Sequence, residues 1–249
     1  MTIDHDTLKG KRILVTGGTT GIGRATVALL AQEGARVLTF GRHQPELDVS
    51  LDNARGKAGN GGEVFGLTAD VATREGVETV FKAVDDQLGG IDILINNAGL
   101  AAEGPQDMDE EAWRYVVETN FVGYLSCARA AIKRMEGQGG QLVFIGSVSA
   151  DFKSPGTSTY AATKAGIRVF AETLRKEVQE KNIKVTLIEP GSVGADMQEK
   201  SPEEQRQAIE KMEMLYAEEL AETILFTLTR SARTDVISMR VEPLMEKAR

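Results

Sequence analysis

Short runs of hydrophobic and β-branched residues alternate along this chain with longer segments in which apolar positions recur every three or four residues. This alternation is typical of βαβ units and predicts a parallel sheet. The predicted strands are Lys11–Thr16, Ala35–Phe40, Glu63–Thr68, Ile91–Ile95, Gln141–Gly146, Ile183–Glu189 and Asp235–Val241. The predicted helices are Gly21–Glu33, Gln44–Lys57, Thr73–Leu88, Glu110–Glu136, Ser158–Lys181 and Ala217–Arg230. The pattern predicts an α/β fold, a doubly wound Rossmann fold whose seven-stranded parallel sheet carries helices on both faces.

No segment rich in proline, serine or charge divides the chain, and 249 residues is an ordinary length for one α/β domain. We therefore expect a single domain over residues 1–249. The segment Ser201–Leu215 differs because it is polar, strongly charged and inserted after the sixth strand. Its apolar residues Ile209, Met212 and Leu215 recur at three-residue steps, which predicts a helix over this segment. We expect about residues 194–216 to form a mobile lid over the substrate.

Composition excludes several classes of function. The 37 acidic and 29 basic residues give a net charge of -8, which disfavours nucleic acid as a partner. One cysteine excludes an internal disulfide, and two histidines are too few for a usual metal cluster. No stretch approaches the roughly 20 apolar residues of a membrane span, and the first apolar run, Ile13–Val15, is too short for a secretory signal. We expect a soluble, cytoplasmic protein that binds no metal, membrane or nucleic acid.

The first predicted strand leads directly into a glycine-rich turn, Thr16-Gly17-Gly18-Thr19-Thr20-Gly21-Ile22-Gly23, where a helix begins. Glycine lets backbone N–H groups approach an anion, and a helix N-terminus supplies unpaired donors and the positive end of a dipole. The spacing is G-x-x-x-G-x-G rather than the commoner G-x-G-x-x-G. Glycines alone also occur in structural turns, but their place at the first strand–helix junction favours a pyrophosphate site.

The end of the second strand indicates which dinucleotide binds. It reads Phe40-Gly41-Arg42-His43, whereas sites selective for NAD place an acid here to bind the ribose hydroxyls. Gly41 takes the place of that acid, and Arg42 can offer a planar fork of donors to a 2′-phosphate. Thr20 can add a hydroxyl donor. The alternative interpretation of Arg42 is an exposed loop cation, but its position after this strand favours NADP(H) as the cofactor.

Tyr160 and Lys164 lie four residues apart on a predicted helix, so their side chains share one face. Lowering a tyrosine pKa from about 10 to about 7 requires roughly 4 kcal/mol of selective stabilisation of the phenolate, which a lysine cation and an oxidised nicotinamide can supply. Such a tyrosine protonates a carbonyl oxygen or accepts an alcohol proton. Without context, this pair is more often two neighbours on a solvated helix face.

Further motifs supply that context, because they occur in a fixed order along nearly the whole chain. Besides the glycine turn and Tyr160-Ala161-Ala162-Thr163-Lys164, they are Asp70-Val71, Asn96-Asn97-Ala98-Gly99, Asn120, Ser147 and Pro190-Gly191. This ordered set resembles the short-chain dehydrogenase/reductase family. The resemblance implies four catalytic residues: Asn120, Ser147, Tyr160 and Lys164. Ser149 competes for the serine role, but Ser147 has the family's spacing to Tyr160.

By the same resemblance, Ser147 holds the substrate oxygen, Asn120 positions Lys164 through water, and Lys164 also binds the nicotinamide ribose. Asp70 and Val71 flank the adenine. The predicted cofactor contacts are Gly17, Thr19, Thr20, Gly21, Ile22, Gly23, Arg42, His43, Asp70, Val71, Asn97, Ala98, Gly99, Tyr160, Lys164, Pro190, Gly191 and Val193.

The chain departs from the family pattern at two places. Ala195 stands where many members have a threonine that binds the nicotinamide carboxamide, a role that Ser192 or backbone groups would have to fill. The tail Asp235–Arg249 contains no glycine, whereas 3-oxoacyl reductases of the family usually end in a glycine-rich segment. The tail is loosely similar to the branch of NADP-dependent 3-hydroxy acid and serine dehydrogenases.

The expected activity is therefore NADP(H)-dependent interconversion of a carbonyl and an alcohol by hydride transfer, with Tyr160 as general acid and base. The alternatives are a 3-oxoacyl thioester (acyl-carrier) reductase and a non-catalytic NADP(H) sensor, which would need none of the proton chemistry. The segments Glu110–Glu136 and Ser158–Lys181 carry more apolar surface than one sheet face needs. Together with the association that is common in the family, this apolar surface favours a homo-oligomer, a tetramer or a dimer.

Overall fold

The computed structural model describes residues 7–195 and 201–246. Within these ranges, seven strands form one sheet in the order β3-β2-β1-β4-β5-β6-β7, and every neighbouring pair is parallel. The strands are β1 (Arg12–Thr16), β2 (Arg36–Gly41), β3 (Glu63–Thr68), β4 (Ile93–Asn96), β5 (Gly140–Ile145), β6 (Ile183–Pro190) and β7 (Ser238–Val241). The predicted seven-stranded parallel sheet is confirmed, although β7 begins at Ser238 and not at Asp235.

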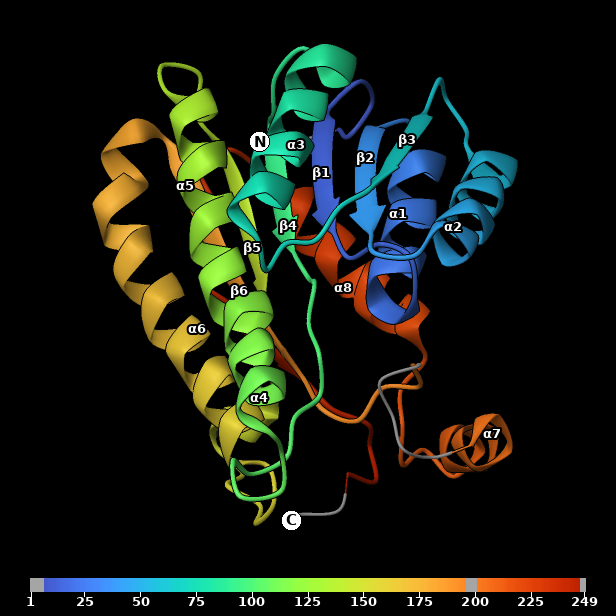
Figure 1. Cartoon of the computed structure of the whole chain (residues 1–249). Coiled ribbons are helices and arrows are strands. Elements are labelled where there is room, and N and C mark those ends of the chain that lie inside the picture. The colour runs from blue at the N-terminus through green and yellow to red at the C-terminus, as the bar shows by residue number, and fades with distance from the viewer. Residues whose placement is uncertain (1–6, 196–200, 247–249) are drawn as a thin grey trace.

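Helices cover both faces of the sheet (Figure 1). One layer contains α1 (Gly21–Gln32), α2 (Gln44–Lys57) and α8 (Ala217–Leu228). The other contains α3 (Arg74–Ala83), α4 (Glu110–Val117), α5 (Gly123–Met135) and α6 (Ser158–Val178). Two π-helical turns interrupt predicted continuous helices: Val84–Leu88 extends α3, and Glu118–Val122 joins α4 to α5. Short 3-10 turns follow β5 at Val148–Ala150 and α6 at Gln179–Lys181.

Alternate residues of β1 supply the cores on the two faces of the sheet. Leu14 belongs to the core beneath α3, α5 and α6, whereas Ile13 and Val15 belong to the core beneath α1, α2 and α8. All three side chains are fully buried. Burial on both faces explains why these strands read as continuous hydrophobic runs.

The position of β1 also determines where a ligand binds. β1 pairs with β2 on one side and with β4 on the other, so the winding of the chain reverses between β1 and β4. In open α/β sheets, ligands bind outside the carboxyl ends of the strands at this reversal. The glycine turn after β1 and the Asn96-Asn97-Ala98-Gly99 motif after β4 therefore meet there.

The segment predicted as a lid contains a shorter helix than expected. Helix α7 covers Pro202–Glu210, and the Ser201 hydroxyl accepts a hydrogen bond from the Glu204 N–H in a capping box. The predicted extension to Leu215 is wrong, because Met212 has a left-handed backbone (φ 57°) and a largely exposed side chain. Helix α7 lines a groove with α1 and α8 beside the main pocket. Closure over a substrate stays a prediction, and its residues 196–200 lie outside the described residues.

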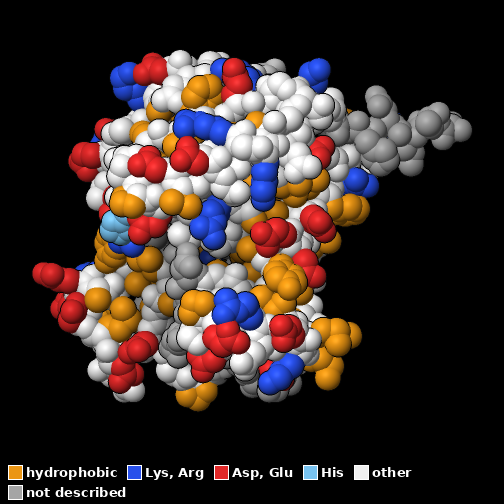
Figure 2. Space-filling model, turned by 90° about the vertical axis from the view of Figure 1, so that its right-hand side faces the viewer, with side chains coloured by type: hydrophobic (Ala, Val, Ile, Leu, Met, Phe, Trp, Pro, Cys, Tyr) orange, Lys and Arg blue, Asp and Glu red, His pale blue; other side chains and the backbone are white. Residues whose placement is uncertain are grey.

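Acidic and basic side chains are interspersed on the face shown in Figure 2, where hydrophobic side chains border a hollow. Among the described residues, no helix is both long and apolar enough to cross a bilayer. The described part of the chain also places no three His, Cys, Asp or Glu side chains together as metal ligands.

Candidate active site

One pocket at the carboxyl ends of the central strands collects nearly all the predicted site residues. Those that line it are Gly17, Thr19, Thr20, Gly21, Ile22, Arg42, His43, Asp70, Val71, Asn97, Ala98, Gly99, Ser147, Tyr160, Lys164, Pro190, Gly191 and Val193. Gly23 and Asn120 do not line the pocket but support its walls. Phe40, Glu46, Leu100, Thr119 and Ile145 line it as well, and the sequence analysis did not anticipate them.

The glycine turn is shaped by close backbone contacts. Gly17 has a positive φ of 66°, and a Cβ there would lie 2.8 Å from the Ala98 Cα. A Cβ on Gly23 would lie 2.2 Å from the Gly17 carbonyl oxygen, so Gly23 lets α1 pack against the turn rather than lining the pocket. Helix α1 begins at Gly21, and its first N–H groups have no partner within the helix. This arrangement is suited to a pyrophosphate.

The loop after β4 holds the glycine turn in place. The Thr16 hydroxyl oxygen accepts hydrogen bonds from the backbone N–H groups of Asn97 and Ala98, each at 2.9 Å. The Asn97 side-chain amide donates to the carbonyl oxygens of Thr16 and Gly17 at 3.1 and 3.0 Å. Asn97 therefore shapes the phosphate-binding turn through hydrogen bonds that reach across the sheet.

At the adenosine end of the pocket, Arg42 and Asp70 meet through a residue that the sequence analysis missed. Arg42 Nη1 donates to the Tyr115 hydroxyl at 2.9 Å, and that hydroxyl donates to Asp70 Oδ2 at 2.6 Å. Burial and the Asp70 carboxylate raise the pKa of Tyr115. No local motif marks Tyr115, because it lies 45 positions from Asp70 and only the packing of α4 brings them together.

Gly41 is enclosed by the phosphate loop. A Cβ at this position would lie 2.4 Å from Thr19 Cγ2 and 2.9 Å from Thr19 Oγ1. Any side chain at residue 41 therefore requires Thr19 to move, and an acidic one is not accommodated beside it. The geometry agrees with a site that lacks the ribose-binding acid of NAD-selective enzymes.

Tyr160 and Lys164 occupy the catalytic end of the pocket on successive turns of α6. Lys164 is almost fully buried, and its Nζ donates to the Ile145 carbonyl oxygen at 2.9 Å. The same Nζ lies 5.6 Å from the centre of the Tyr160 ring. The predicted sharing of one helix face is confirmed, and β5 supplies the carbonyl that anchors the lysine.

Burial shifts the pKa values of both groups in opposite directions. It lowers the pKa of Lys164 to about 8, and it raises the pKa of Tyr160, against which the Ser147 hydroxyl acts weakly. The expected fall of the tyrosine pKa to about 7 is therefore not a property of these side chains alone. Burial therefore favours the neutral phenol of Tyr160.

The structure separates the two candidate serines. Ser147 lines the pocket, and Ser149 does not. Ser149 instead supports Ser147: its N–H donates to Ser147 Oγ at 3.1 Å, and Ser147 Oγ donates to Ser149 Oγ at 3.1 Å. Ser147 is the N-cap of the 3-10 turn that follows β5.

Asn120 lies behind the pocket wall and is fully buried. Its side chain forms a pair of 2.8 Å hydrogen bonds with the backbone N–H and carbonyl of Leu100. It also donates to the Thr163 hydroxyl at 3.4 Å, on the helix that carries Lys164. Asn120 therefore connects the loop after β4 to the catalytic helix, within the π-helical turn that separates α4 from α5.

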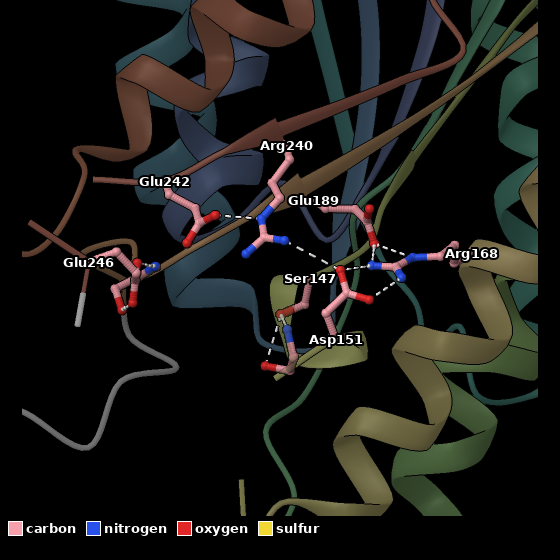
Figure 3. A network of polar contacts seen from close by, with 9 residues as sticks. Ser147, Asp151, Arg168, Glu189, Arg240, Glu242 and Glu246 are labelled. Atoms are coloured by element: carbon pink, nitrogen blue, oxygen red, sulfur yellow. Dashed lines mark hydrogen bonds and ion pairs between the residues drawn. The ribbon is translucent and has the colours of Figure 1, made fainter. Parts of the chain in front are cut away.

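The loop after β6 is held by the C-terminal tail. Glu246 accepts hydrogen bonds from the Ser192 backbone N–H at 2.9 Å and from the Ser192 hydroxyl at 3.0 Å (Figure 3). Ser192 does not line the pocket, so its hydroxyl is not placed to take over the role of the missing threonine. Ala195 lines the pocket beside Gly21. No sequence signal marked Glu246, because its contact spans 54 positions.

Comparison with known proteins agrees with this geometry. Residues 11–206 match the family model described as short chain dehydrogenase. The 3-oxoacyl-[acyl-carrier-protein] reductase FabG of Vibrio cholerae is 34% identical over 203 residues, 81% of each chain. An uncharacterized oxidoreductase of Staphylococcus haemolyticus is 31% identical over 239 residues, 95% of this chain and 99% of that protein. A short chain dehydrogenase from Burkholderia cenocepacia, solved in complex with NADP, superimposes with a TM-score of 0.84 at 26% identity, covering 96% and 98% of the chains.

The chain is therefore a member of the short-chain dehydrogenase/reductase family, and its activity is that of an oxidoreductase. The family is one of enzymes that use a nicotinamide dinucleotide and act on small molecules. The tail that carries Glu246 lies beyond the matched range.

Proposed function

We propose that this protein is an NADP(H)-dependent oxidoreductase that interconverts a carbonyl and a primary or secondary alcohol. The observation that carries the proposal is the joint lining of one pocket by the phosphate-binding turn, by Arg42 and by Ser147, Tyr160 and Lys164. A non-catalytic sensor would need only the first two parts.

The residues present fit a bound dinucleotide. The turn around Gly17 brings backbone close to where a pyrophosphate lies, and the N-terminus of α1 offers donors. Thr119 lines the same pocket, and its buried hydroxyl has no hydrogen-bond partner among the described residues. Gly41 places no acid at the end of β2 to repel a 2′-phosphate, and Arg42 is exposed at the mouth, where a charge-assisted contact can form.

In the proposed reaction, the bound nicotinamide supplies or accepts the hydride. Tyr160 donates its hydroxyl proton to the carbonyl oxygen during reduction and takes it back during oxidation. Ser147 donates a hydrogen bond to the same oxygen and so stabilises the negative charge that develops on it. Lys164, held by Ile145, places a positive charge beside Tyr160 and binds the nicotinamide ribose. Asn120 keeps the catalytic helix against the loop after β4.

A 3-oxoacyl thioester reductase is the second candidate, because relatives that are 34–35% identical carry that name. Initial rates with NADPH and with NADH, over ketones, aldehydes, hydroxy acids and a 3-oxoacyl thioester, test both proposals. Turnover with NADPH on simple carbonyls supports the first, and turnover confined to the thioester supports the second. Absence of turnover across the panel with either cofactor would contradict both.

We also propose that the chain forms a homo-oligomer through α5 and α6. Val169 on α6 is 64% exposed, and Leu125, Ala128, Ile132, Phe170 and Leu174 line a shallow apolar groove between the two helices. A second copy of the same face would cover this groove and bury Val169.

A further inference from the structure

One guanidinium group joins three segments that build the catalytic end of the pocket. Arg168 lies on α6 one turn beyond Lys164, which itself lies one turn beyond Tyr160. Arg168 Nη1 and Nη2 donate to Asp151 Oδ1 and Oδ2 at 2.6 and 3.0 Å. Arg168 Nε donates to Glu189 Oε1 at 2.7 Å. Figure 3 shows Arg168 between the two carboxylates, close to the segment that carries Ser147.

One carboxylate lies in the loop after β5, and the other lies near the end of β6, where the second loop of this end of the pocket begins. Asp151 directly follows the 3-10 turn that Ser147 begins, and Glu189 directly precedes Pro190-Gly191. A backbone hydrogen bond from Gly146 N to the Ile188 carbonyl, 2.7 Å long, joins the two strands just before the loops diverge. Beyond that bond, Arg168 connects the loop after β5 to the end of β6, and both of them to helix α6.

Burial distinguishes the two halves of this contact. The Asp151 side chain is 45% exposed, and the Glu189 side chain is 10% exposed. The Asp151 half is a bidentate pair, a geometry that fixes the direction of the loop as well as attracting it. Loss of Arg168 would leave the charge of Glu189 buried without compensation, which is destabilising. Only a planar guanidinium can use Nε and both terminal nitrogens on two carboxylates at once, so lysine is not equivalent.

A second arginine holds the same aspartate from the sheet edge. Arg240 on β7 lies beside Glu189 in the strand register, and its Nη1 is 3.4 Å from Asp151 Oδ2. Its guanidinium also lies 4.7 Å from the centre of the Phe152 ring. The Arg168 hydrogen bonds lower the pKa of Asp151, which therefore stays ionised at neutral pH. The Ser147 loop is thus held at Asp151, its exposed end, by charges from two elements.

We infer that Arg168 is a positioning residue that sets the distance between the Ser147 loop and the loop Pro190–Val193 on either side of Tyr160. The inference rests on the proposed function, in which Ser147 and Tyr160 act on one substrate oxygen. A misplacement on the order of 1 Å in such a site costs about a hundredfold in rate. Arg168→Lys is expected to lower kcat by about tenfold or more, with the Kd of NADPH changed less than about twofold, because the phosphate and adenosine contacts lie elsewhere.

A double variant separates positioning from charge compensation. Arg168→Met with Glu189→Met removes both buried charges, a change that is often neutral for stability. If charge compensation were the whole role, the double variant would recover both Tm and kcat. The positioning role predicts a Tm near that of the wild type and a kcat that stays low. Arg175→Lys is the matched control, because Arg175 lies on the same helix, is similarly exposed at 25% and pairs with Asp235.

Hydrogen–deuterium exchange supplies a readout that needs no turnover. The Asp151 N–H donates to the Val148 carbonyl at 2.9 Å, and the Gly191 N–H donates to the Val241 carbonyl at 2.8 Å. Both amides are expected to exchange faster in Arg168→Lys and in the double variant, and at the wild-type rate in Arg175→Lys. Unchanged exchange in both loops, or full recovery of kcat in the double variant, would overturn the inference. A wild type that reduces no substrate would instead refute the proposed function.

Discussion

The Arg42→Ala variant tests the proposed cofactor preference at the residue where it originates. Arg42 is exposed and donates to Tyr115 at 2.9 Å, so a bound 2′-phosphate must compete with that contact. Two charge-assisted hydrogen bonds contribute about 3–6 kcal/mol, and the lost tyrosine bond costs about 1 kcal/mol. The net loss in the variant is at least about 2 kcal/mol, or roughly a thirtyfold rise in the Kd of NADPH. The Kd of NADH, which lacks the phosphate, should change less than about threefold.

Fluorescence titration of each reduced cofactor at fixed salt measures both constants, and fixed salt matters because the site is exposed. Arg74→Ala is the control, since it removes one positive charge from the surface at a side chain that is 85% exposed and paired with Glu78. Equal losses for NADPH and NADH in Arg42→Ala would refute the reasoning. So would an equal loss of NADPH binding in Arg74→Ala, which would assign the effect to net charge.

Three further predictions follow from the packing, the burial and the exposed helix face. Gly41→Asp should destabilise the fold by about 1–3 kcal/mol through its clash with Thr19, and it should weaken NADPH binding. Adding Thr19→Ala should restore the Tm but not NADPH binding. An unchanged NADPH affinity in Gly41→Asp would count against the site. Burial gives Lys164 a pKa of about 8, against 10.5 for the free side chain. Between these two pH values the unfolded chain binds more protons than the folded chain. The free energy of unfolding therefore rises with pH in this range. In urea unfolding, the free energy of unfolding of the wild type should therefore rise relative to that of Lys164→Met from pH 8 to pH 10, and an unchanged difference would show that the lysine is not desolvated. Sedimentation at micromolar concentration should detect an oligomer that Val169→Asp dissociates, and a wild-type monomer would contradict the proposed face.

The sheet could be predicted from the sequence because its central strands are buried on both faces and are mostly apolar. Strand ends then predicted the site, since Gly17, Asn97 and Gly191 all follow parallel strands and must meet at one edge. Strand β7 was predicted too long because it lies at the sheet edge, where half-exposed residues weaken the pattern. The π-helical turn at Glu118–Val122 was missed because one wider turn scarcely disturbs the apolar period.

The residues that the sequence analysis missed act through long-range side-chain contacts. Tyr115 meets Asp70, Glu246 meets Ser192, and Arg168 meets Asp151 and Glu189, and none of these pairs is close in the chain. A polar residue on an amphipathic helix or in a tail has the same local pattern whether it is solvated or bonded across the fold. Only the packing of α4, α6 and the tail against the pocket distinguishes these cases.

The most direct test of the central claim is the effect of Tyr160→Phe on turnover and on cofactor binding measured in the same preparation. The ring remains and only the hydroxyl is lost, so the pocket and the neighbouring Lys164 should keep their positions. The account predicts a kcat lowered by about a hundredfold or more with the Kd of NADPH changed less than about twofold, because a general acid contributes at least that factor. Retention of more than about a tenth of the wild-type rate would contradict it, since another group would then donate the proton.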